Sequence, residues 1–197
     1  MTNFFNNYSN LFSILAAIFN TIAWGLYIYS QKENKSNPIG WLLSFIIIIA
    51  SAWTFFSITK SLLSSATYIV GCIACLIVLI QSLKQPFKIT IIDSITVIAA
   101  LALIPLSFIF PNIAVYLLSI YYFATYSPFL RGLISGQNTE NHTPWIVWSI
   151  ANVFLILAQI NHQLNHLILP ISNFLCITAI AITSFAINRK HRKPNNI

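Results

Sequence analysis

Long apolar runs alternate with short polar connections along the chain, a pattern that predicts a bundle of membrane-crossing helices. A helix needs about 20 apolar residues to cross the hydrocarbon core of a bilayer. Runs of this size occupy seven segments, at residues 11–29, 40–58, 66–83, 90–110, 112–130, 144–160 and 167–187. Because the connections are too short to fold alone, we expect one all-α integral membrane domain spanning residues 1–197.

Composition supports this interpretation and excludes a soluble domain. Hydrophobic residues make up 57% of the chain and charged residues only 7%, whereas about a quarter of the residues in soluble domains are charged. The three cysteines, Cys72, Cys75 and Cys176, lie inside apolar runs, which argues against a disulfide framework or a loop-borne zinc site. The C-x-x-C pair in the third segment is best explained by close helix packing.

The basic residues predict how the chain is oriented. Cytoplasmic loops of membrane proteins carry an excess of Lys and Arg. With seven crossings, Lys60 is the one basic residue on the side of the N-terminus, and nine lie on the other side: Lys32, Lys35, Lys84, Lys88, Arg131, Arg189, Lys190, Arg192 and Lys193. We therefore expect an N-terminus outside, a cytoplasmic C-terminus with a basic tail at 188–197, and a plasma (inner) membrane location. The positive charge is then a topology determinant, and no nucleic-acid partner is expected.

The second and sixth segments begin alike. Asn37-Pro38-Ile39-Gly40-Trp41 and Thr143-Pro144-Trp145 each follow a polar loop that contains asparagine, and proline is favoured in the first turn of a helix. Both therefore predict a helix start with a tryptophan at headgroup depth. Superposing the two starts gives a first three-helix repeat at 11–83, a linker helix at 90–110 and a second repeat at 112–187, which is a parallel 3+1+3 arrangement.

Residues 127–131, Ser-Pro-Phe-Leu-Arg, followed by Asn141-His142-Thr143-Pro144-Trp145, Trp148 and Asn152, resemble the PQ-loop superfamily, which includes the SWEET and semiSWEET transporters. The resemblance is greatest to small bacterial seven-span members. It implies transport, a bacterial inner-membrane location and a hinge at Pro128. The Pro-Gln pair of the family appears here as Pro128-Phe129, and the first segment reads Trp24-Gly25-Leu26-Tyr27 at the matching place.

Polar side chains at bilayer depth are the candidate site residues, because such groups face the interior of a bundle. Asn20, Asn152, Gln159 and Asn173 meet this condition. By resemblance, Asn173 with Trp148 or Asn152 corresponds to the asparagine and tryptophan of SWEET-type pockets. The alternative is that these amides join helices to one another through hydrogen bonds.

Aromatic side chains are a second group of candidates, since a flat ring can stack on a solute. Tyr121 and Tyr122 are candidates for this role. For Trp24 and Trp53, which lie near helix ends, an interfacial belt is the favoured explanation.

The few acidic and histidine side chains offer little catalytic chemistry. Thr90 and Asp93 resemble a capping box at the start of the fourth segment, and Glu33 and Glu140 lie in polar loops where we expect them to be solvated. His162 and His166 have metal-ligand spacing but are too few for a site. No nucleophile and base pair, zinc motif or Schiff-base lysine is present in the expected spans, so we expect no enzyme activity, metal or cofactor.

These features favour a transporter or facilitator that moves a small neutral or zwitterionic solute by alternating access. The competing class is a non-transporting seven-span receptor or membrane assembly partner. The expected partners are the lipid bilayer and a small-molecule solute, and the sequence leaves open whether the chain forms a homo-oligomer.

Overall fold

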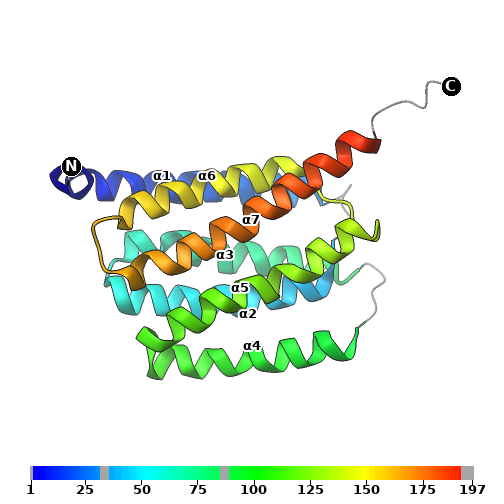
Figure 1. The fold of residues 1–197 in the computed structure, drawn as a ribbon, viewed down its shortest axis with the longest axis horizontal. Helices are drawn as coiled ribbons and strands as arrows, with labels where there is room; N and C mark the ends of the chain where they lie inside the picture. The colour runs from blue at the N-terminus through cyan, green and yellow to red at the C-terminus, as the bar shows by residue number, and fades with distance from the viewer. Residues whose placement is uncertain (1, 32–35, 85–88, 192–197) are drawn as a thin grey trace.

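A computed structural model describes residues 2–31, 36–84 and 89–191 of the chain (Figure 1). The described residues form helices joined by short connections: α1 Thr2–Ser30, α2 Pro38–Thr59, α3 Leu62–Ser82, α4 Ile91–Ile109, α5 Pro111–Ile134, α6 His142–Gln159 and α7 Leu164–His191. The all-α class that the hydropathy pattern predicts is confirmed for this part of the chain.

Six of these helices are long and apolar enough to cross a bilayer. The helix outside this set is α6, which has 18 residues and includes the polar side chains of Asn152 and Gln159. The chain is therefore an integral membrane protein. The seventh crossing that the sequence predicts stays a prediction, because the amides of α6 lower its hydropathy.

The two similar helix starts are both capped by asparagine. Asn37 Oδ1 accepts a hydrogen bond from the backbone N–H of Ile39 at 2.9 Å, and Asn141 Oδ1 accepts one from the N–H of Thr143 at 3.0 Å. Each cap satisfies a backbone donor that has no partner within the helix. The predicted starts of α2 and α6 are therefore confirmed, and α6 begins two residues earlier than expected, at His142.

The start of α4 is a capping box, which confirms the structural role predicted for Asp93. Thr90 Oγ1 accepts from the N–H of Asp93 at 3.1 Å, and Asp93 Oδ2 accepts from the N–H of Thr90 at 3.0 Å. The second carboxylate oxygen pairs with Arg131 of α5 at 3.1 Å. This ion pair, which the sequence did not predict, fastens the start of α4 to the end of α5.

We describe α1–α3 and α5–α7 as two groups of helices. Helix α3 packs against α1 and α2, and α7 packs against α5 and α6. The groups meet where α1 packs against α6 and α2 against α5. Helix α4 lies at the edge of the bundle against α2 and α5 (Figure 1). Only 17% of its span is buried, so most of its surface is available to lipid.

Helix α1 begins and helix α7 ends at opposite ends of the bundle (Figure 1). We call the end at which α2 begins and α7 ends the basic end, because Lys84, Arg131 and Arg189 lie in or after the last turns of helices that finish there. Lys60 lies at the opposite end, after α2. The other basic residues used to predict topology are Lys32, Lys35, Lys88, Arg192 and Lys193, which lie outside the described residues, and Lys190, whose side chain is not described.

Candidate functional site

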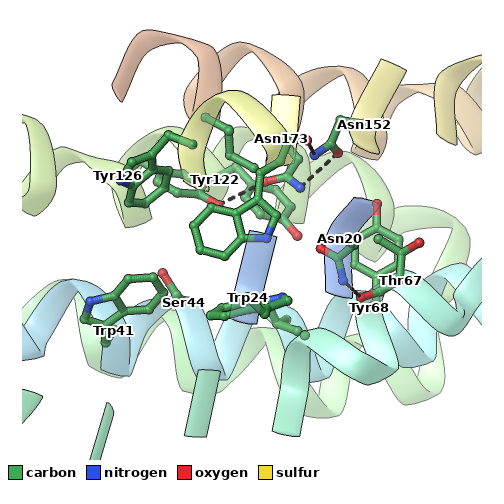
Figure 2. Close-up of a pocket in the computed structure, with 15 residues that line it drawn as sticks. Asn20, Trp24, Trp41, Ser44, Thr67, Tyr68, Tyr122, Tyr126, Asn152 and Asn173 are labelled. Atoms are coloured by element: carbon green, nitrogen blue, oxygen red, sulfur yellow. Dashed lines mark hydrogen bonds between the residues drawn. The ribbon is translucent and has the colours of Figure 1, made fainter. Parts of the chain in front are cut away.

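A cavity lies between the two groups of helices, with lining residues from both (Figure 2). Every helix except α4 contributes to its lining. The lining residues are Asn20, Trp24, Trp41, Ser44, Ile48, Thr67, Tyr68, Gly71, Tyr122, Tyr126, Trp145, Trp148, Asn152, Asn173 and Ile177. No acidic, basic or histidine side chain belongs to this lining among the described residues.

Four of the five side chains predicted to contact a solute line this cavity: Asn20, Trp148, Asn152 and Asn173. The fifth, Tyr121, points elsewhere, because its hydroxyl donates to the backbone carbonyl of Thr96 in α4. Whether the four residues bind a solute stays a prediction. What the structure establishes is that they come from three helices and meet in one space.

The asparagines are joined by hydrogen bonds. Asn173 Nδ2 donates to Asn152 Oδ1 at 3.0 Å, and the hydroxyl of Tyr126 donates to Asn173 Oδ1 at 3.0 Å. Across the cavity, Asn20 Nδ2 donates to the backbone carbonyl of Thr67 at 2.9 Å (Figure 2). These bonds hold the amides in fixed positions, and they link helices as well. The amides therefore line the cavity and also join helices to one another.

Three buried hydroxyl groups in the lining have no hydrogen-bond partner within the protein: those of Ser44, Thr67 and Tyr68. The three residues are at most 7% exposed. A buried hydroxyl without a partner costs about 1–3 kcal/mol, so these groups are suited to bonding something inside the cavity. Figure 2 shows Ser44 on one side of the cavity and the other two on the opposite side.

These hydroxyls were not among the predicted site residues, and no signal in the sequence distinguishes them from other serine, threonine and tyrosine hydroxyls. Serine and threonine are common in membrane helices because their hydroxyls usually bond the carbonyl four residues earlier. Ser65, Thr125 and Ser149 do so at 2.9–3.0 Å. The hydroxyls of Ser44 and Thr67 make no such bond, and this difference appears only in three dimensions.

Aromatic side chains close the cavity toward the basic end. Trp41 and Trp145, each four residues after its asparagine cap, stack with ring centroids 6.2 Å apart. Tyr27 of α1 and Phe129 of α5 both lie within 5.8 Å of these two rings. We call this cluster the aromatic plug, and it comprises Trp24, Tyr27, Trp41, Phe129, Trp145 and Trp148.

The interfacial belt expected to include Trp24 is wrong, because this side chain is only 6% exposed. Trp41 and Trp145 are 2% and 1% exposed, so their rings face the interior of the bundle, and the headgroup depth expected for them stays a prediction. They turn inward because each ring packs against other rings of the plug. Trp53, by contrast, is 40% exposed and stacks on Phe108 at the surface of the bundle.

A network of polar groups lies outside the cavity lining, toward the opposite end of the bundle. Gln159 Nε2 donates to Ser64 Oγ at 3.2 Å, and Ser13 Oγ lies 3.4 Å from Ser64 Oγ. His166 Nδ1 lies 3.4 Å from Gln159 Oε1 at the edge of this network. Aromatic rings thus border the cavity toward the basic end, and this hydrogen-bonded network links α1, α3 and α6 nearer the other end of the bundle.

Glu140 is the largest departure from the sequence-based expectations. This residue precedes α6 and was expected in solvent, yet it is 2% exposed. The hydroxyl of Tyr27 donates to Glu140 Oε2 at 2.8 Å, and Trp145 Nε1 donates to the same oxygen at 3.3 Å. The carboxyl group is therefore attached to the side of the plug away from the cavity. Glu33, for which the same expectation was stated, lies outside the described residues.

Comparisons of the chain with protein-family models, with curated proteins and with solved structures give no significant match. The resemblance to the PQ-loop superfamily therefore rests on the sequence motifs alone. The class that the fold defines is a helical integral membrane protein with a cavity between two groups of helices, lined by aromatic rings, amides and hydroxyl groups.

Proposed function

We propose that this protein is a transporter or facilitator for a small neutral or zwitterionic solute, which it exposes alternately to the two sides of the membrane. The observation that carries this proposal is the set of unpartnered hydroxyls of Ser44, Thr67 and Tyr68 in a cavity lined by aromatic rings and amides. The hydroxyls and amides can form hydrogen bonds with a solute, and the apolar faces of the solute can stack on the aromatic rings. The lack of charge in the lining disfavours a strongly charged solute.

The packing of the helices supports the proposed 3+1+3 architecture. Pairing α1 with α5, α2 with α6 and α3 with α7 relates the two groups, since α3 and α7 each pack against both other members of their group. The same pairing relates the contact of α1 with α6 to that of α2 with α5. In this architecture α4 is the linker helix and α6 is the seventh crossing.

The resemblance to PQ-loop proteins is consistent with the geometry of the plug. In the proposed pairing of α1 with α5, Leu26-Tyr27 corresponds to Pro128-Phe129. Tyr27 and Phe129 both contact Trp41 and Trp145. We propose Pro128 as a hinge that moves this part of α5. The distribution of Lys and Arg supports a plasma (inner) membrane orientation with the basic end in the cytoplasm.

The size of the cavity limits the solute. Its volume is about 40 Å³, whereas one water molecule needs roughly 10–15 Å³ on this scale. About three waters fill it in this closed form, so a disaccharide requires a large expansion. A small solute fits the proposal better.

The experiment that tests the proposal identifies solutes retained by the purified protein by mass spectrometry and then measures their exchange in liposomes. Asn173→Ala removes the amide that bonds both Asn152 and Tyr126. We expect retention to fall about tenfold, which corresponds to one or two lost hydrogen bonds. Tyr121→Phe is the matched control, because its hydroxyl bonds Thr96 outside the cavity, and it should retain solute normally.

The result also separates the two classes of function. Retention that depends on Asn173, together with exchange across the liposome membrane, supports transport. Retention without exchange supports a receptor. If neither the unaltered protein nor the Tyr121→Phe control retains a solute, and no solute is exchanged across the liposome membrane, the proposed function is wrong.

A further inference from the structure

Glu140 has the surroundings of a proton-binding group. Its carboxyl lies at the basic end, in the connection before α6, and not in the cavity lining. One oxygen accepts the bonds from Tyr27 and Trp145, while Oε1 is buried without a hydrogen-bond partner. Burial of an ionised carboxylate is unfavourable unless both oxygens are well paired. The packing therefore favours the neutral acid.

A chain of hydrogen bonds leads to this carboxyl. Gln31 Nε2 donates to Ser36 Oγ at 2.9 Å. Ser36 Oγ lies 2.6 Å from the hydroxyl of Tyr27, which donates to Glu140. Since Tyr27 has one proton to donate, the Ser36 hydroxyl donates to Tyr27. The carboxyl is thus connected to the segment between α1 and α2 as well as to α6.

Under the proposed pairing of the two groups of helices, Glu140 corresponds in position to Ser36. Ser36 directly precedes Asn37, the cap of α2, and Glu140 directly precedes Asn141, the cap of α6. Both side chains meet at the hydroxyl of Tyr27. The partner of Tyr27 in the plug is Phe129, which has no hydroxyl. One acid and one phenol thus distinguish two otherwise similar halves of the plug.

No described cation neutralises this carboxyl, because the ion pair of the described residues is between Arg131 and Asp93. Burial raises the pKa of Glu140 from its ordinary value of 4.5 to about 7, while hydrogen bonds from Tyr27 and Trp145 lower it in part. Its charge therefore changes near neutral pH.

Other titratable groups around Glu140 come from each neighbouring element. From α1 the hydroxyl of Tyr27 faces it, and from α6 the nearest is His142, whose ring packs edge-on against Phe185. From α7, the uncharged Asn188 donates to the backbone carbonyl of Glu140 at 3.1 Å, and Arg189 follows it on the surface. Lys32, Glu33 and Lys35, which precede Ser36, lie outside the described residues.

We propose that Glu140 is a proton-binding site that controls the opening of the aromatic plug toward the basic end. The protonated acid stays buried behind Trp145 and the plug is closed. When the proton leaves, the carboxylate moves into water, and the side chains of Tyr27 and Trp145, which donate hydrogen bonds to it, move as well. The cavity then opens to the solution at the basic end. This inference rests on the proposed function for its meaning in transport, but the opening can be measured without a solute.

The size of the effect follows from proton linkage. A carboxyl with a pKa of about 7 when buried and an ordinary value in water changes the ratio of open to closed protein about tenfold between about pH 6 and about pH 8. The sign is fixed: higher pH favours the open form, because the closed form holds the proton more tightly.

The test measures access to a cysteine introduced at Ser44, which is 4% exposed in the cavity. The native Cys72, Cys75 and Cys176 are first replaced, and a membrane-impermeant thiol reagent is applied to sealed vesicles from the basic end. Rates are compared between this protein and the same protein with Glu140→Gln, which mimics the neutral acid. Ionisation of the thiol changes the labelling rates of the two proteins equally. The ratio of the rate with Glu140 to the rate with Glu140→Gln therefore reports only the effect of the Glu140 charge.

We expect this ratio to rise about tenfold between about pH 6 and about pH 8. A ratio that is constant with pH overturns the proposal, including the case in which His142 causes the pH dependence. If Glu140→Gln does not fold, Tyr27→Phe replaces it. Losing the donor raises the pKa of the buried acid further, so the midpoint of labelling should move to higher pH, and an unchanged midpoint overturns the proposal.

The outcome is independent of the solute experiment. If labelling depends on Glu140 as expected but no solute is retained or exchanged, the proton site stands and the proposed function fails. If solute is exchanged but the labelling ratio does not change with pH, the proposed function stands and the proton site fails.

Discussion

Gly40 allows the ring of Phe129 to lie directly against the backbone of α2. A Cβ at this position would come within 2.6 Å of that ring, a separation that real side chains do not adopt. Phe129 is fully buried and packs between Trp41 and Trp145, so it has little room to move. The absence of one methyl group therefore allows α2 and α5 to close the basic end of the cavity.

Gly40→Ala should destabilise the protein through this contact. Overpacking of a buried site costs about 1–3 kcal/mol. The midpoint of thermal unfolding in detergent should therefore fall in the Gly40→Ala variant. Gly25→Ala in α1 is the matched control, because its Cβ would meet nothing within 4 Å. Gly to Ala in a helix interior is stabilising by about 0.5–1 kcal/mol. If Gly40→Ala and Gly25→Ala change the unfolding midpoint in the same direction, the contact of residue 40 with Phe129 does not determine the stability of the protein.

At the scale of helices, α5 carries both a plug residue and an internal proline. Pro128 has no N–H, so the carbonyl of residue 124 cannot receive its usual helical bond, and the helix can bend there. Helix α4 also contains a proline, Pro105, but contributes nothing to the cavity lining. The two prolines have the same local effect on a helix, but only the helix of Pro128 lines the cavity.

Pro128→Ala should slow the opening of the cavity, because a continuous helix resists the bend that moves Phe129. Labelling of a cysteine at Ser44 from the basic end should slow severalfold. Pro105→Ala should leave the labelling rate unchanged. Both variants gain helix stability of at most about 3 kcal/mol, so thermal unfolding serves as the internal reference. Equal effects of the two variants on labelling would remove the hinge assignment.

Local features made the helices predictable from the sequence. Apolar runs end at asparagine, proline and charged residues, and Asn37, Asn141 and Thr90 cap helices as their residue types favour. The amides of Asn20, Asn152 and Asn173 stand out because such groups are unfavourable in lipid.

The missed site residues depend on contacts between distant segments. Glu140 is in a polar loop, and its burial requires Tyr27 and Ser36, which lie more than a hundred residues earlier. Tryptophans near helix ends turn inward here because rings from two groups of helices meet at the plug. Neither the burial of Glu140 nor the inward position of these tryptophans can be predicted from the residues of a single segment.

At the scale of the whole molecule, the orientation of the bundle follows from its basic end. If nine of the ten basic residues face the cytoplasm, single cysteines introduced at positions 3 and 195 should react with an impermeant thiol reagent from opposite sides of the membrane. The N-terminal site should label in intact cells, and the C-terminal one only after permeabilisation. Labelling of both from one side would exclude an odd number of crossings and with it the seventh crossing by α6.

The aromatic plug also gives the protein an optical signature. Of the chain's 5 tryptophans, the four in the plug are linked by ring separations of 4.6–6.2 Å. At such distances the electronic transitions of neighbouring indoles couple, so the near-ultraviolet circular dichroism should contain a contribution that depends on the packing of this cluster. Trp53 alone reports from the surface. The unlabelled protein therefore contains its own optical probe of the closed end of the cavity.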